Sequence, residues 1–338
     1  MARYPRSIGG IGRHLSRIYI ILALLIIAVV IALIYKPHPF GKKETSAASN
    51  NVNVPDVKKA IPPVSPQPRP ELNLSRMPEP TAEDNPKVTD LIAEAAAFTT
   101  DTPGKIILAR DRLNEALLLP MSAQQHAFVK AQLSALADKW LFSRTIFPDD
   151  KLCSSYTVKP GDQLRTIGEQ FKVPYEILMQ INNIGRPEAL QTGEAIKVIN
   201  GPFHARIYRS TFTMDLFLQN TFVRSFPVGL GKPGMETPTG LWVVKPGGKL
   251  PKPAWKDPIS GKTFYPEDPD YPLGSRWIGL EGVEGQAKGR TGFAIHGTQK
   301  PEEIGTAGSQ GCIRLHNGDA ILMYNLLEPG LSKVEVVE

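Results

Sequence analysis

One histidine and one cysteine stand in neighbouring segments whose residue types suit nucleophilic chemistry. Residues 292–298 read GFAIHGT, a pattern that predicts a strand ending at His296. Sixteen residues after His296, the segment 309–315 reads SQGCIRL and holds Cys312. A thiol becomes a strong nucleophile when a neighbouring histidine takes its proton. The pair therefore predicts Cys312 as a nucleophile and His296 as its general base.

The residues around Cys312 fit this chemistry. Gly311 lets the backbone approach a substrate closely, and backbone amides here are suited to holding a developing oxyanion. Arg314 is suited to binding a carboxylate with its two-pronged guanidinium group. We expect Arg314 and Ser309 to contact the substrate.

Three other roles for these residues stay open from the sequence. A lone cysteine is usually a small buried apolar residue, and Cys153 and Cys312 would form one disulfide in an exported protein. A zinc site from His296, Cys312 and His316 has no obvious fourth ligand. A papain-like peptidase would place its cysteine well before its histidine, which is the reverse of the order here.

The segment 202–338 contains strand patterns and no helical crossovers. Four runs separated by glycine and proline either alternate between apolar and polar residues or are rich in β-branched and aromatic residues. They are 204–208, 213–218, 222–227 and 240–244. Strands joined without helices pair mostly antiparallel. We therefore expect a mostly antiparallel β domain that carries His296 and Cys312.

This segment resembles the catalytic domain of YkuD-type L,D-transpeptidases, through HGT at 296–298 followed by SQGCIRLHN at 309–317. The resemblance implies that Cys312 attacks the carbonyl between an L-centre and a D-centre in a peptidoglycan tetrapeptide stem. His296 would be the base, with the Gly297 carbonyl orienting its ring and Gly311 contributing to the oxyanion hole. Many members have histidine where this chain has Gln310. Neither a metal ion nor an organic cofactor is implied.

A smaller module precedes this domain, at 154–200. It opens with YTVKPGD at 156–162, continues with two short helical patterns and closes with a strand at 196–199. This order, strand–helix–helix–strand, and the opening run resemble the LysM family, which implies binding to peptidoglycan glycan strands. The chain departs from the family pattern at Arg165 and Thr192. A module that only packs on its neighbour is the alternative.

Two further segments have no assigned chemistry. Apolar residues at helical spacing predict three helices in 86–148, with Asn85 as the first N-cap, a second start at Thr102, and a capping box from Ser122 and Gln125. Phe128 is expected on the buried face of the third helix. This segment is interpreted as a spacer or packing domain. The segment 246–274 is rich in proline, glycine and aromatic residues, and is either a flap over the cleft or a surface loop.

The N-terminal part has the composition of a membrane anchor on a stalk. We expect residues 1–17 to be a basic, cytoplasmic tail, and the uncharged run 18–35 is long enough to nearly cross a bilayer as a helix. A cleaved signal peptide is the alternative to a retained anchor. The segment 36–85 is a proline-rich linker, since it holds ten prolines and an eleventh, Pro86, follows it directly. We expect a single-pass protein of the inner or plasma membrane of a bacterium, with its catalytic part on the periplasmic or extracellular side.

The sequence thus describes a multidomain protein: a transmembrane helix, a proline-rich linker, a helical segment, a βααβ LysM module and a β catalytic domain. The net charge of +6 suits a membrane surface or an anionic wall polymer, and no basic patch interleaved with aromatics indicates nucleic acid. The predicted function is an L,D-transpeptidase that cross-links peptidoglycan. The alternatives are an L,D-carboxypeptidase, in which water accepts the acyl group, and a non-catalytic wall-binding scaffold.

Overall fold

The structure is a computed structural model that describes residues 77–101 and 105–338. The predicted tail, membrane span and almost all of the linker lie outside these residues. No helix within the described ranges has the length and apolar character needed to cross a bilayer.

Three helices form the first described segment, as the sequence predicts: α2 (Pro86–Asp101), α3 (Ile106–Ala116) and α4 (Ala123–Trp140). The Asn85 side chain caps α2 by accepting from the amide of Lys87 at 3.0 Å. The predicted start at Thr102 falls outside the described residues, and α3 begins at Ile106 after Lys105.

The two features predicted for α4 need correction. Ser122 accepts from the Gln125 amide at 3.1 Å, but the Gln125 side chain does not return to Ser122. Instead its Oε1 accepts from the Asn85 amide at 2.8 Å, so Gln125 ties α4 to the start of α2. Phe128 is 47% exposed rather than buried, because the apolar face of α4 lies along Val129, Leu133, Leu136, Ala137 and Trp140.

The LysM module has the predicted order, with β1 (Cys153–Thr157), α5 (Leu164–Phe171), α6 (Tyr175–Asn182), a short 3-10 helix η2 (Pro187–Ala189) and β2 (Ala195–Ile199). β1 and β2 pair antiparallel. Lys197 of β2 is 1% exposed, and its Nζ donates to the carbonyls of Trp140, Ser143 and Thr145. An ammonium group at the end of α4 therefore holds the module to the helical segment.

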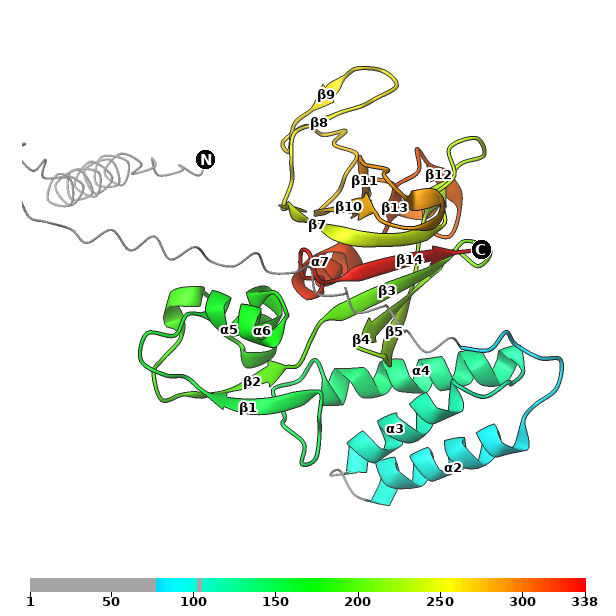
Figure 1. Ribbon diagram of the computed structural model, residues 1–338, viewed down its shortest axis with the longest axis vertical. Coiled ribbons are helices and arrows are strands. Elements are labelled where there is room, and N and C mark those ends of the chain that lie inside the picture. The colour runs from blue at the N-terminus through cyan, green and yellow to red at the C-terminus, as the bar shows by residue number, and fades with distance from the viewer. Residues whose placement is uncertain (1–76, 102–104) are drawn as a thin grey trace, which may run out of the picture. The chain divides into compact units, whose positions relative to one another are not determined.

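The catalytic segment is built on a curled eight-stranded sheet, in the order β13-β11-β10-β7-β14-β3-β4-β5 (Figure 1). The bounds of these strands are β3 (Phe203–Tyr208), β4 (Thr213–Leu218), β5 (Thr221–Pro227), β7 (Gly240–Leu250), β10 (Trp277–Gly282), β11 (Phe293–His296), β13 (Ile313–Arg314) and β14 (Lys333–Val337). β11 pairs parallel with β13 and β14 parallel with β3, whereas the other neighbours pair antiparallel. The mostly antiparallel domain is therefore confirmed.

Smaller elements complete this segment. They are β6 (Leu230–Gly231), β8 (Trp255–Lys256), β9 (Thr263–Phe264), η3 (Gly285–Ala287), η4 (Pro301–Glu303), β12 (Ala307–Ser309) and α7 (Asn317–Leu326). β8 and β9 form a hairpin within the proline-rich segment 246–274. The hairpin is tied to the chain before Cys312, because Gln310 Nε2 donates to Asp257 Oδ1 at 3.2 Å.

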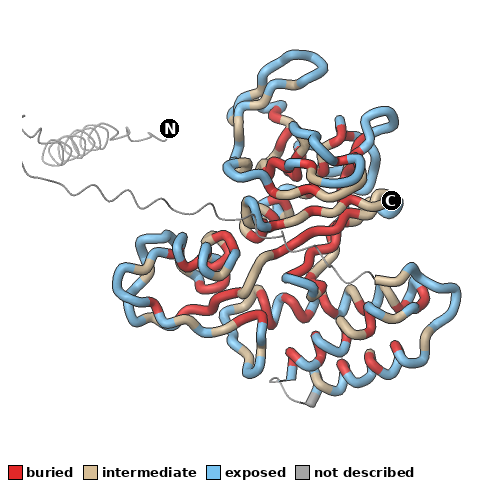
Figure 2. Tube along the Cα trace, viewed as in Figure 1, coloured by how far each residue is buried: buried red, intermediate tan, exposed pale blue. Residues whose placement is uncertain are grey.

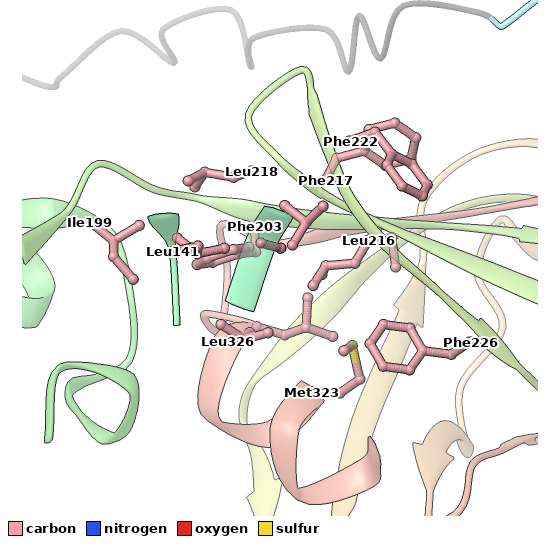
Figure 3. Close-up of a cluster of buried hydrophobic side chains, with 14 of the residues drawn as sticks. Leu141, Ile199, Phe203, Leu216, Phe217, Leu218, Phe222, Phe226, Met323 and Leu326 are labelled. Atoms are coloured by element: carbon pink, nitrogen blue, oxygen red, sulfur yellow. The ribbon is translucent and has the colours of Figure 1, made fainter. Parts of the chain in front are cut away.

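One hydrophobic core runs through the three segments (Figure 2). Figure 3 shows Leu141 from the end of α4, Ile199 from β2, Phe203 from β3 and Leu326 from α7 in a single cluster of buried side chains. The helical segment also covers the sheet edge at β5, since Arg224 of β5 donates to the Ser134 carbonyl of α4 at 3.2 Å. Lys130 of α4 pairs with the fully buried Asp215 of the neighbouring strand β4 at 2.6 Å. Covering an edge strand protects it from pairing with another chain.

Candidate active site

The β11–β13 pair brings the histidine and the cysteine to one face of the sheet. Ile295 lies opposite Ile313, and His296 lies opposite Arg314. Cys312 directly precedes β13, so this parallel register places it beside Ala294. Because side chains alternate along strands, Ala294 and His296 share a face with Cys312 and Arg314, whereas Ile295 and Ile313 point into the core.

His296 is held in one orientation by its surroundings. Its Nδ1 lies 2.6 Å from the Gly297 carbonyl, as the family resemblance implies. A carbonyl only accepts, so Nδ1 carries the proton and Nε2 is the basic nitrogen. The ring also stacks on Trp277, with centroids 5.7 Å apart and an interplanar angle of 16°. The imidazole is thus placed to receive a proton at Nε2.

Burial keeps both the His296 ring and the Cys312 thiol uncharged. It lowers the pKa of His296 to about 4, a shift that the Arg314 charge favours and the hydrogen bond to Gly297 opposes. It also raises the pKa of the Cys312 thiol to about 11, against the opposing effects of the Ala294 backbone and the Arg314 charge. At neutral pH the site therefore holds a thiol and a neutral imidazole, and the Cys312 sulfur contacts the Gly292 carbonyl at 3.9 Å.

The turn before Cys312 is fixed by buried hydroxyl groups. Ser309 is 1% exposed, and its Oγ donates to the Cys312 carbonyl at 2.6 Å and accepts from the Gly311 amide at 3.1 Å. Thr237 Oγ1 donates to the Gly311 carbonyl at 2.9 Å. The Ser309 hydroxyl thus stabilises the turn, and its contact with substrate stays a prediction. The Gly311 amide donates to the same hydroxyl, and its role in the oxyanion hole stays a prediction.

Gly311 suits this turn because of its backbone conformation and its close packing. Its φ is +111°, a region that residues with a side chain rarely adopt. A Cβ at this position would also lie 2.8 Å from Phe293 Cε1. Only glycine fits here without strain.

The guanidinium group of Arg314 is already paired with a carboxylate of the protein. Its Nη1 pairs with Glu303 Oε2, and Lys300 lies 3.1 Å from the same carboxylate. Arg314 contributes positive charge to the site while one of its nitrogens is held by Glu303. A substrate carboxylate would therefore meet a guanidinium group that is already partly engaged.

Asn317, at the start of α7, is a positioning residue that the sequence reasoning missed. Its Oδ1 accepts from the amides of Ser275 and Thr298, and its Nδ2 donates to the Thr298 carbonyl. A Cβ on Gly297 would lie 2.2 Å from Asn317 Oδ1, so the glycine lets the amide approach. The available signal was its position as the last residue of the SQGCIRLHN run, at a helix start.

The alternative roles for the cysteines find no support in this geometry. Cys153 and Cys312 are both free thiols, and Cys153 is buried in the LysM module. Over residues 77–101 and 105–338, no three His, Cys, Asp or Glu side chains gather closely enough to hold a metal ion.

Comparisons with known proteins agree on the family. A family model of the L,D-transpeptidase catalytic domain (YkuD) matches residues 202–336, and a LysM domain model matches residues 156–198. The putative L,D-transpeptidase YkuD of Bacillus subtilis is 30% identical over 183 residues, which cover 52% of this chain and 94% of the relative. The probable L,D-transpeptidase ErfK/SrfK of Escherichia coli is 30% identical over 182 residues, covering 51% of this chain and 50% of the relative.

Solved structures are more distant. An L,D-transpeptidase from Mycobacterium tuberculosis H37Rv has 19% identity and a TM-score of 0.33, covering 44% of this chain and 64% of that structure.

Proposed function

This chain belongs to the YkuD family of L,D-transpeptidases, and from that membership we propose that Cys312 and His296 carry out its reaction through a thioester. The observation that carries the proposal is the shared face of β11 and β13, on which the half-buried Cys312 and the oriented His296 lie. The LysM domain supports binding of the same polymer, peptidoglycan.

In the first half-reaction, the Cys312 proton passes to His296 Nε2 as the sulfur attacks the carbonyl between the L- and D-centres of a tetrapeptide stem. The amide of Cys312 is our candidate donor to the resulting oxyanion. The C–N bond then breaks, and the departing amine takes the proton from His296. The products are a Cys312 thioester and a released D-amino acid.

In the second half-reaction, an amine from another stem attacks the thioester and gives its proton to His296. The C–S bond breaks, the sulfur regains a proton, and a new peptide bond joins the two stems. Water in place of the amine would give the carboxypeptidase reaction with the same residues. Each proton that leaves a reacting group thus returns to one, and no cofactor enters the balance.

Mass spectrometry of the full-length protein with a tetrapeptide stem, or with a carbapenem, tests this mechanism. We expect one adduct on Cys312, absent in Cys312→Ala and formed at least tenfold more slowly in His296→Ala, since general bases contribute at least that much. Cys153→Ala is the matched control and should keep the adduct, because Cys153 is 2% exposed. No adduct on folded protein with a reduced Cys312 would favour the wall-binding scaffold.

We also propose that residues 18–35 anchor the chain in the membrane, with the residues after them on the periplasmic or extracellular side. The support is the uncharged apolar run in the sequence and the location of peptidoglycan outside the membrane. Protease digestion of intact spheroplasts tests this orientation. Protection of the catalytic segment from the external protease would contradict it.

A further inference from the structure

Charged side chains gather where the LysM module meets the catalytic segment. The two parts touch through α6 and α7, and Asn325 Nδ2 of α7 donates to Gln180 Oε1 of α6 at 3.2 Å (Figure 1). We call the surface around this contact the seam. Its charged residues are Arg165, Glu169 and Glu176 from the module and Lys249, Arg276 and Glu328 from the catalytic segment.

Two cations of the seam share one tyrosine ring. Lys249 Nζ lies 4.5 Å from the ring centroid of Tyr324, and Arg276 Cζ lies 5.3 Å from it. Arg276 Nη1 donates to the Ser275 carbonyl at 2.8 Å, but its buried Nε has no acceptor among the residues that the structure describes. Arg110, by contrast, is paired with two carboxylates. The cations of the seam are therefore not fixed in the way that a structural arginine is.

The glutamates of the seam face these cations without pairing with them. Burial lowers the pKa of Lys249, and the charges of Glu176 and Glu328 oppose this shift. Burial raises the pKa of Glu328, and Lys249 opposes this rise. Glu176 and Glu169 reinforce the rise, whereas Arg165 opposes it. All six charges are thus close together, yet none forms an ion pair with any residue in 77–101 or 105–338.

The mixture of charges indicates the class of ligand. An anion would be repelled by the three glutamates, and a cation by the three basic side chains. A hydroxyl group both donates and accepts, so a chain of sugar rings with hydroxyl and acetamido groups can bind both kinds of side chain. The half-buried rings of Tyr175 and Tyr324 add apolar faces on which sugar C–H groups can pack.

The seam is continuous with the proposed active site. The Arg276 carbonyl accepts from the Gly297 amide at 3.2 Å, and the next residue, Trp277, stacks on His296. Peptide stems branch from glycan strands. A strand that lies on the seam would therefore hold its stems close to His296.

We propose that the seam binds the N-acetylhexosamine strand of peptidoglycan, and that this contact brings the attached stems to Cys312. The proposal rests on the proposed function for the identity of the polymer and of the reacting cysteine. Lys249 donates to sugar oxygens and Glu176 accepts from sugar hydroxyls. Arg165, a departure from the LysM pattern, contributes the third basic side chain.

Hydrogen–deuterium exchange of the full-length protein localises the contact. The probe is a peptide-free octasaccharide prepared from peptidoglycan glycan strands. We expect it to slow exchange in 164–182 of the module and in 317–328 of the catalytic segment, because a bound strand stabilises both sides of the seam. Exchange that slows only in the module loops 158–163 and 183–194 would overturn the proposal.

Calorimetric titration with the same octasaccharide tests the side chains. Lys249→Gln and Glu176→Gln should each weaken binding about tenfold, the usual effect of losing a charge-assisted hydrogen bond. Lys245→Gln on β7 and Glu188→Gln in the module are the matched controls at exposed positions and should keep the affinity. Equal affinity of all four variants would overturn the proposal.

Acylation of Cys312 by two kinds of stem separates this proposal from the mechanism. Lys249→Gln and Glu176→Gln should lower kcat/KM about tenfold for stems attached to a glycan strand and leave it unchanged for a free tetrapeptide. The unchanged reaction also shows that each variant is folded, and should a variant not fold, the exchange map of the unmodified protein decides. If neither stem acylates the unmodified protein while the octasaccharide still slows exchange at the seam, the thioester mechanism fails and the glycan site stands.

Discussion

The ionisation of Cys312 in the unliganded protein gives the most direct test of the site's electrostatics. With a pKa of about 11, only about one thiol in ten thousand is a thiolate at pH 7. Because only the thiolate is alkylated, the rate should rise about a hundredfold between pH 7 and pH 9 and keep rising above pH 9. A thiol with the ordinary pKa of about 8.5 would gain only about 25-fold over this range and then level off.

The assay is alkylation by iodoacetamide, followed by intact-protein mass spectrometry from pH 6 to pH 10. Cys153→Ala leaves Cys312 as the single thiol, and circular dichroism at each pH confirms that the protein stays folded. His296→Asn should barely change the profile, because burial keeps His296 neutral above a pKa of about 4. The same variant should slow acylation by a peptide stem, in which the base is needed.

One result would refute this reasoning. A rate that levels off below pH 7 and loses that plateau in His296→Asn would demonstrate a preformed thiolate–imidazolium pair. Burial would then be outweighed by the attraction between the two charges, and the proton would move before the substrate binds.

Three further predictions concern stability and the turn at Cys312. Because Gly311 has a φ of +111°, Gly311→Ala should lower the free energy of unfolding by about 1–3 kcal/mol in urea melts and slow thioester formation at least tenfold in acylation assays. The control Gly318→Ala, whose added Cβ would meet open space, should have neither effect. Lys197→Met should lower the free energy of unfolding in urea by roughly 3 kcal/mol, because three carbonyls lose their hydrogen-bond donor. The control is Lys151→Met at an exposed position, and equal stability of the two variants would contradict the prediction. Burial lowers the pKa of His204 to about 4 in the folded protein, whereas in the unfolded chain it is about 6.5. As the pH falls below about 6.5, the unfolded chain therefore takes up a proton before the folded protein does, and the stability present above that pH is lost. Relative to His204→Asn, the unmodified protein should lose about 2 kcal/mol between pH 7.5 and pH 5, and parallel pH–stability curves would contradict this.

Features that depend on neighbouring residues in the chain were predictable. The alternation in 213–218 marks β4 to the residue, and Pro174 marks the start of α6. The His296 position at the end of β11 follows from the apolar run before it. Each of these signals is local, because strand alternation and helix capping are set within a few residues.

Features that depend on distant residues were not predictable. The Gln125 side chain finds its partner at Asn85, and Lys197 finds its acceptors on a loop more than fifty residues away. The sequence did not indicate that tertiary packing buries Ser309 and commits its hydroxyl to the turn at Gly311 and Cys312. Phe128 sits at a helical spacing that fits the buried face, but the contacts of α4 with β5 and α3 select a different stripe. Periodicity alone does not specify which neighbour covers a helix.

The sixteen residues between His296 and Cys312 acquire a structural reason from the parallel pairing of β11 and β13. Parallel neighbours need a connection that leaves one end of the sheet and returns to the other. Here that connection contains η4 and β12, and β12 pairs with β6 before the chain turns at Gly311. His296, the proposed base, comes at the end of the first strand and Cys312, the proposed nucleophile, directly before the second, so the register offsets them by two residues on one face.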